Sequence, residues 1–154
     1  MNQFWSAGDA LIKNIHTYQR HKRGSSFSAK CLRKLARGRH FILSIITSSD
    51  IGIDAKFGPD VKLPHPNGVV IHDDATIGAG CMIMQQVTIG QTAESSAPNI
   101  GMHVYIGAGA KVLGNVTVGD GAQIGANAVV LIDVPADCTA VGVPALLVPS
   151  KRGK

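Results

Sequence analysis

The chain has 154 residues, of which 45% are hydrophobic, 5% aromatic and 16% charged, with 18 glycines. This length suits one domain with a small appendage, and no apolar run approaches the ~18 residues that a membrane-spanning helix needs. The three cysteines lie far apart and form no CxxC pair, so neither a disulfide framework nor a cysteine zinc site is indicated. No apolar signal region follows Met1, and the sequence therefore predicts a cytoplasmic setting.

The net charge of +5 is unevenly distributed along the chain. Residues 1–47 hold nine Lys or Arg against one Asp, a net charge of +8, whereas residues 48–154 hold six against nine, a net charge of −3. A basic segment of this kind attracts an anionic acceptor or an anionic lipid surface, or it is simply a solvated helical surface. No recognised nucleic-acid-binding motif accompanies the charge, so nucleic acid is not expected as a partner.

Residues 1–47 are predicted to form an N-terminal helical cap. A first helix over residues 6–18 is indicated by a capping Ser6 or Asp9 and by an apolar stripe of Leu11, Ile12, Ile15 and Tyr18. After a break at residues 20–26, a second helix is expected from about residue 27 to residue 37. Its inward-facing side chains are expected to be Phe27, Cys31, Leu32 and Leu35. Residues 41–46 either continue this helix or form an extended entrance to the next domain.

Residues 48–148 are predicted to form the main domain, because a large apolar residue returns at every sixth position. The two series are Ile51, Phe57, Leu63, Ile71, Ile77, Ile83, Ile89 and then Ile100, Ile106, Val112, Val118, Ile124, Val130. A small or medium apolar residue stands two positions before almost every member, and glycine often follows. A period of six is neither helical nor that of an isolated strand, and it is typical of the hexapeptide repeat of a parallel β-helix.

Each hexad in this interpretation supplies one short strand and one turn. The aliphatic residue and the small residue two places earlier point inward, since side chains alternate across a strand. Glycine is expected at the corners, where the backbone needs positive φ or a close approach. Known hexapeptide families imply a left-handed triangular coil of about eighteen residues. The predicted fold class is therefore all-β, a left-handed parallel β-helix with a short α-helical cap; a sandwich of short strands is the alternative.

Two interruptions of the repeat are candidate functional segments. Residues 64–68 place two prolines around His65, which indicates a shaped turn rather than a regular strand. Residues 91–99 lack aliphatic side chains and are expected to form a loop that leaves the column, a common place for function on a rigid scaffold. Residues 149–154 form a basic tail beyond the domain.

Several motifs resemble those of the serine acetyltransferase family over residues 50–148. They are Asp50 and His65, fifteen positions apart, and the segments 68–71, 85–90, 106–115 and 141–145. The resemblance implies acetyl transfer from acetyl-CoA to a hydroxyl, with His65 as general base and Asp50 orienting its imidazole. It also implies a homotrimer whose active sites lie between subunits. The acetyl-CoA groove would be bordered by Gly90, Ala108 and Ala126, with Lys111 and the basic tail as candidates for the nucleotide phosphates; small residues also suit the coil itself.

The chain departs from the family where the family binds the acceptor. The family's Arg-His pair is replaced by Ser96-Ala97, and the carboxylate before the catalytic histidine is replaced by Pro64. A site for an amino acid needs charged partners, because unpaired charges are costly to desolvate. This favours a sugar hydroxyl of a surface polysaccharide as acceptor, with serine O-acetylation as the alternative. The neutral groups suited to sugar hydroxyls are Asn67, Gln85, Gln86 and Ser96.

Two remoter functions remain open. A zinc hydratase needs three histidines, two of them close in sequence, and His65, His72 and His103 lack that pairing. No metal is therefore expected. A non-catalytic trimeric scaffold would leave His65 incidental.

Overall fold

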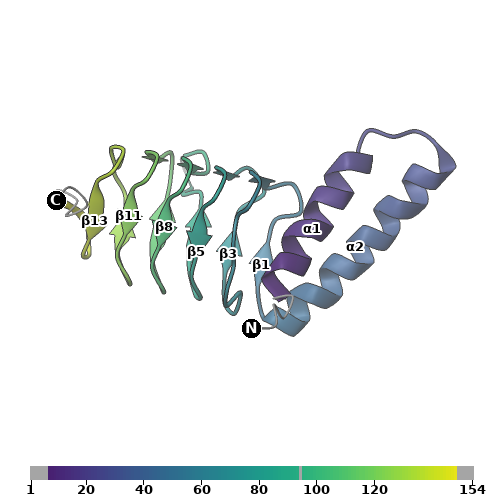
Figure 1. Cartoon of the computed structure of the whole chain (residues 1–154), viewed down its shortest axis with the longest axis horizontal. Coiled ribbons are helices and arrows are strands. Elements are labelled where there is room, and N and C mark those ends of the chain that lie inside the picture. Colours follow the sequence, from purple (N-terminus) through teal and green to yellow (C-terminus); the bar gives the residue numbers. More distant parts are fainter. Residues whose placement is uncertain (1–6, 94, 149–154) are drawn as a thin grey trace.

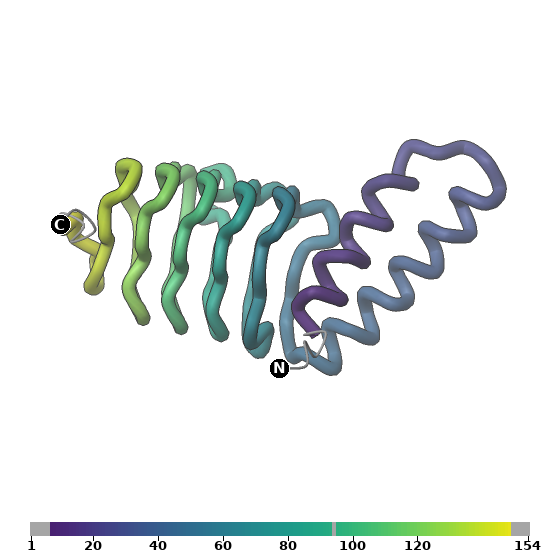
Figure 2. The backbone as a smooth tube through the Cα atoms, in the orientation of Figure 1, coloured from purple at the N-terminus to yellow at the C-terminus, as the bar shows by residue number. Residues whose placement is uncertain are grey.

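The computed structural model describes residues 7–93 and 95–148. Within these ranges the chain forms two helices, α1 (Ala7–His21) and α2 (Phe27–Thr47), followed by fourteen short strands. The strands wind into a long column, and the two helices form a hairpin that slants away from one end of it (Figure 1). The tube view in Figure 2 shows the coils stacked one on the next.

Three sheets form the three sides of the column. Sheet A contains β1 (Asp50–Ile51), β3 (Val70–Ile71), β6 (Thr88–Gly90), β9 (Lys111–Leu113) and β12 (Val129–Val130). Sheet B contains β2 (Lys56–Phe57), β4 (Thr76–Ile77), β7 (Asn99–Ile100) and β10 (Thr117–Val118). Sheet C contains β5 (Met82–Ile83), β8 (Tyr105–Ile106), β11 (Gln123–Ile124), β13 (Thr139–Val141) and β14 (Leu146–Val148). The pairing is parallel except between β13 and β14. The prediction of a parallel β-helix is thereby confirmed.

The core is the column of aliphatic residues that the repeat predicted. In sheet C, Ile83, Ile106 and Ile124 lie directly above one another, and each is completely buried. Cys81 is also completely buried, and its thiol donates to the Gly101 carbonyl at 3.0 Å. Burial raises the pKa of the Cys81 thiol, so this cysteine packs as a neutral small side chain.

Glycine serves the corners for two different reasons. A Cβ on Gly107 would lie 2.6 Å from the backbone nitrogen of Ala126 in the next coil, so here glycine permits a close approach. Gly109, two residues later, has φ +73°, a left-handed turn conformation that glycine adopts at little cost. Gly90 differs from both, because the nearest atoms to its added Cβ would be 3.8 Å away.

A matched pair of substitutions tests this distinction. Gly107→Ala is expected to lower the free energy of unfolding by about 1–3 kcal/mol, since backbone atoms of the next coil cannot yield to the new methyl group. Gly90→Ala is expected to leave stability unchanged or slightly raised, because the added methyl group fits. Denaturant unfolding of both variants at one protein concentration measures the difference. Equal losses of stability would contradict the account of the corners.

Helix α1 covers the first coil and extends three residues beyond the predicted end at residue 18. Leu11 and Ile15 are completely buried and belong to the same core cluster as Leu63. Next to this apolar contact, the Gln19 side-chain amide donates to the carbonyls of Ile53 and Ala55, at 3.1 and 2.8 Å. The helical cap is thus attached to the column by both packing and hydrogen bonds.

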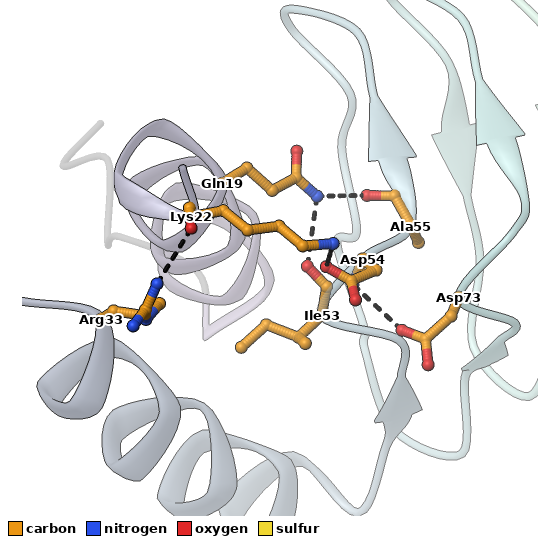
Figure 3. Close-up of polar contacts among 7 residues, drawn as sticks. All are labelled: Gln19, Lys22, Arg33, Ile53, Asp54, Ala55 and Asp73. Atoms are coloured by element: carbon orange, nitrogen blue, oxygen red, sulfur yellow. Dashed lines mark hydrogen bonds and ion pairs between the residues drawn. The ribbon is translucent and has the colours of Figure 1, made fainter. Parts of the chain in front are cut away.

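An exposed ion pair adds to this attachment. Lys22 Nζ lies 2.7 Å from Asp54 Oδ1, and this hydrogen bond with Asp54 raises the pKa of Lys22 (Figure 3). The backbone nitrogen of Asp54 in turn donates to Asp73 Oδ1 at 3.0 Å. An exposed pair of this kind contributes little to stability by itself.

Helix α2 is continuous, so residues 41–46 prolong the helix rather than entering the column in extended form. It begins after Ser26, whose hydroxyl accepts from the Ala29 backbone nitrogen at 3.2 Å, and ends at Ser48, which has φ 49°. Of the described helices, neither combines the length and the apolarity that crossing a bilayer requires.

The predicted inward face of α2 is wrong. Phe27 is 88% exposed and Leu35 64% exposed, and Cys31 and Leu32 are exposed as well. The buried face carries Ala29 and Ala36 instead. Small residues are needed there because α1 comes close: the side-chain amide of Asn14 donates to the Ala36 carbonyl at 2.8 Å.

Candidate active site

One edge of the column collects most of the predicted site residues. At this edge, here called the C–A edge, the chain turns from sheet C into sheet A once in every coil. Backbone hydrogen bonds of 2.9 Å join successive turns, from Gln86 to Asn67, from Gly109 to Gln85, and from Asn127 to Ala108. Asn67, Gln85 and Gln86, Ala108 and Ala126 therefore lie on successive coils along a single line.

His65 lies in the turn at the helical end of this edge, and its side chain is exposed. Asp50 begins β1 at the same end. The backbone joins the two segments, because Gly68 donates to the Ser48 carbonyl and Asp50 donates to the Val69 carbonyl, both at 2.9 Å. No hydrogen bond or ion pair between described residues joins the His65 imidazole to the Asp50 carboxylate. The structure thus places both residues at one corner, and their catalytic pairing stays a prediction.

The polar groups of the C–A edge differ in what they offer a ligand. Gln86 and Asn67 are exposed, and Gln86 takes a positive φ of 59°. Gln85 Oε1 is buried and has no hydrogen-bond partner among the described residues. Lys111 Nζ donates to the Gln86 carbonyl at 2.7 Å, which ties this cation to the edge.

Two of the predicted site residues lie elsewhere. Gly90 ends β6 at the opposite side of sheet A, where the chain turns into sheet B, and Ser96 is exposed in the loop that follows. The Gly90 carbonyl accepts from Gly114 at 2.9 Å. We call this side the A–B edge; it is separated from the C–A edge by roughly 15 Å, the length of about five extended residues. The predicted residues therefore fall into two separate groups on one chain, here called candidate half-sites.

A shallow cleft of about 240 Å³ lies along the first three strands of sheet A, on the side of the A–B edge. It is lined by Asp50, Gly52, Val70, Ile71, His72, Asp73, Ile89, Gly90 and Gln91. His72 Nδ1 accepts from the Asp74 backbone nitrogen at 3.2 Å, and the ring nitrogen lies 3.8 Å from the Asp74 carboxylate. Two of the lining residues, Asp50 and Gly90, are predicted site residues.

The sequence analysis missed His72, Asp73 and Gln91 as lining residues. The sequence did contain a signal for His72. It directly follows the aliphatic repeat residue Ile71, and the corresponding position in the coils on either side is a glycine, Gly52 and Gly90. A histidine at a position where the repeat favours glycine indicates that its side chain has a role at this place in the column. Among residues 7–93 and 95–148, no three His, Cys, Asp or Glu side chains gather as ligands of a metal would.

A three-sided column built from six-residue repeats, one on each side of a coil, with polar residues and an exposed histidine along its edges, defines a hexapeptide-repeat protein. The pattern of the family described as "Bacterial transferase hexapeptide (six repeats)" matches residues 97–131. The serine acetyltransferase of Helicobacter pylori (strain J99) is 42% identical over 135 residues, which are 86% of this chain and 75% of that protein. The chain belongs to the serine acetyltransferase family.

Solved structures support the same assignment. The soybean serine acetyltransferase in complex with serine has a TM-score of 0.80 and 38% identity, over 92% of this chain and 57% of that one. The Brucella abortus enzyme in complex with coenzyme A has a TM-score of 0.81 and 33% identity, over 94% and 56%. The likeness identifies the column as the left-handed β-helix of this family. The chain spans about half the length of several curated relatives that it matches.

Proposed function

We propose that this protein transfers the acetyl group of acetyl-CoA to an acceptor hydroxyl, with His65 as general base. The observation that supports this most directly is that His65 is exposed at the helical end of the C–A edge, in a chain of the serine acetyltransferase family. The imidazole takes the hydroxyl proton as the acceptor oxygen attacks the thioester carbonyl. The C–S bond then breaks, the ester is released, and the CoA sulfur leaves with the proton that the imidazole returns. Asp50 would hold the imidazole in the tautomer that this step needs.

The groove for acetyl-CoA is proposed between two copies, along Ala108 and Ala126 of one copy and Gly90 of its neighbour. Gly90 supports this, because a methyl group at its Cα would meet no atom closer than 3.8 Å in its own chain. Its own coil therefore does not require a glycine there, and the close approach of a ligand or a neighbouring copy gives a reason. The Brucella abortus relative has been solved with coenzyme A. Lys111 is the weaker candidate for the phosphates, since its ammonium is already bonded to the Gln86 carbonyl.

A homotrimer would bring the two half-sites together. On one chain, His65 and Gly90 lie on opposite sides of sheet A, so a single groove cannot include both. In a three-fold assembly of parallel columns, the C–A edge of one copy faces the A–B edge of the next. The acceptor would then meet His65 of one copy while the arm of acetyl-CoA passes Gly90 of its neighbour.

Serine is the acceptor that the relatives favour over the sugar predicted from the sequence. The soybean relative has been solved with serine. The cleft beside Asp50 also supplies charge of the kind that an amino acid needs and that Ser96, Ala97 and Pro64 do not provide. Asp73 and His72 line this cleft: the Asp73 carboxylate could bind the ammonium of an amino acid, and the His72 ring, whose Nδ1 accepts from Asp74, could donate a hydrogen bond from Nε2 to its carboxylate. A sugar hydroxyl remains the second candidate, on one observation: the uncharged Ser96 and Ala97 stand where the family has an Arg-His pair.

An acceptor panel tests the proposal. Thiol release from acetyl-CoA is expected to be fastest with serine, and slower with neutral or sialylated glycans. Asp73→Asn should raise the KM for serine about tenfold, because it removes the charge but keeps an oxygen for the Asp54 backbone nitrogen. The KM for acetyl-CoA should not change, and the exposed Asp60→Asn, remote from the cleft, should alter neither constant. Turnover of a glycan but not of serine would reverse the choice of acceptor. No thiol release with any acceptor would favour a non-catalytic scaffold.

A cytoplasmic setting for the protein stays a prediction.

A further inference from the structure

The outer face of α2 carries an apolar surface that no described residue covers. Its members, here called the α2 stripe, are Phe27, Cys31, Leu35, Phe41, Ile42, Ile45 and Ile46, all exposed. Ile46 is 69% and Phe41 68% exposed. A soluble domain rarely leaves so many large apolar side chains together on one element without a use for them.

The stripe is continuous along the helix. At 100° per residue its members occupy one sector of about 140°, opposite the buried Ala29 and Ala36. With 21 residues, α2 is roughly 30 Å long, and the stripe runs from its first residue to its last full turn. A groove of about 750 Å³ opens along its middle, lined by Cys31, Lys34, Leu35, Gly38, Arg39, Ile42 and Leu43.

Cations flank the stripe on both sides. Helix α2 carries five Lys or Arg and no Asp or Glu. Two of the arginines contact the first half of the hairpin: Arg33 Nη1 donates to the carbonyl of Lys22, in the turn after α1, at 2.9 Å, and the Arg37 guanidinium lies 5.6 Å from the ring centre of Tyr18 in α1. Lys34 and Arg39 line the groove itself. Cations are therefore placed both beside the apolar stripe and within its groove.

The combination of an apolar stripe with neighbouring cations favours an anionic binding partner. Pairing the α2 stripes of two copies would bring together two helices with five cations each and no anion, and like charges oppose that contact. An amphipathic helix with an apolar stripe between Lys and Arg is the arrangement that lies in the interface of an anionic bilayer. We propose that the α2 stripe binds the surface of an anionic lipid membrane, with its apolar side chains at the level of the acyl-chain boundary and its cations at the headgroups.

The position of the hairpin suits this contact. The two helices lie at one end of the column and slant away from it (Figure 1), and α1 is fixed to the first coil by Leu11, Ile15 and Gln19. Strands β8 and β11 lie farther from the hairpin than β1 and β3 do (Figure 1), and the tube in Figure 2 shows the same order of coils. Most of the C–A edge would remain open while α2 rests on lipid, so membrane contact and acyl transfer are compatible.

Vesicle flotation tests the proposal with the full chain. Vesicles of equal parts phosphatidylcholine and phosphatidylglycerol should carry the protein upward, and vesicles of phosphatidylcholine alone should not. The double variant Leu35→Glu, Ile42→Glu should lose at least tenfold in partition coefficient. The matched control is Leu131→Glu, Ile132→Glu, which changes two apolar side chains of the column that are 53% and 47% exposed; it should bind as the parent does.

A second variant introduces no negative charge. Lys34→Gln, Arg39→Gln should weaken binding to the anionic vesicles roughly thirtyfold at low salt, as loss of about 1 kcal/mol per basic residue predicts. Raising the salt concentration should weaken parent binding in the same direction.

Three results would overturn the proposal. Equal binding to both vesicle types would show that charge plays no part, and no binding to either would remove the membrane. If vesicles do not bind and Leu35→Glu, Ile42→Glu lowers the mass seen in sedimentation velocity, the stripe is instead an interface between copies. Thiol release from acetyl-CoA without vesicles, measured on the same variants, reports separately on the proposed acetyl transfer.

Discussion

Replacing His65 with alanine is expected to lower kcat for acetyl transfer by about 10²–10⁴-fold, the usual contribution of a positioned general base. A hydroxyl has a pKa far above neutrality and attacks a thioester poorly unless its proton is removed in the same step. The KM for acetyl-CoA should change little, because the imidazole acts on the acceptor. Initial rates of thiol release at saturating acceptor measure the effect.

The matched control is His103→Asn. His103 is also exposed but lies in a turn between sheets B and C, away from both edges of sheet A, and asparagine tolerates its φ of 55°. This variant should keep its full rate. His65→Ala should also unfold at the parent's denaturant concentration, since the side chain is exposed. A His65→Ala protein with more than half the parent's kcat would refute the assigned role.

Replacing Ile106 with alanine is expected to lower the free energy of unfolding by about 2–5 kcal/mol. Ile106 is completely buried between Ile83 and Ile124 in sheet C. The column is narrow and its coils are joined by backbone hydrogen bonds on three sides, so the walls cannot collapse into the space that the lost methyl groups leave. Denaturant unfolding followed by circular dichroism measures the loss.

Ile132→Ala is the control for this substitution. Ile132 is 47% exposed, so the same chemical change removes little buried surface and should cost less than about 1 kcal/mol. Both variants must be compared at one protein concentration, because assembly adds to apparent stability. Equal costs would mean that Ile106 does not lie in a rigid core.

The column could be predicted because one period controls both local structure and packing. Ile106 is buried for the same reason as Ile83 and Ile124: each occupies the same position of its hexad. The orientation of α2 could not be predicted in this way. Its sequence offers an apolar face with Leu35 and a small-residue face with Ala36, and only the close approach of α1 decides between them.

The candidate site was predictable in its parts but not in its arrangement. Asp50 and His65 came from a spacing that resembles a known family, and both do lie at one corner. The sequence does not show on which side of sheet A each turn falls, because that depends on how many residues each coil uses. For this reason Gly90 was grouped with Ala108 although they lie on different edges.

The two ends of the column have a consequence for assembly. At one end α1 covers the first coil, and at the other β14 returns antiparallel along β13 while Ala145 donates to the Val129 carbonyl at 2.8 Å. Stacked coils left bare would template the strands of another molecule and grow head to tail into filaments. Within the described residues, both ends of the stack are thus partly covered, which opposes polymerisation along the axis and favours association through the flanks of the column or through the helical hairpin.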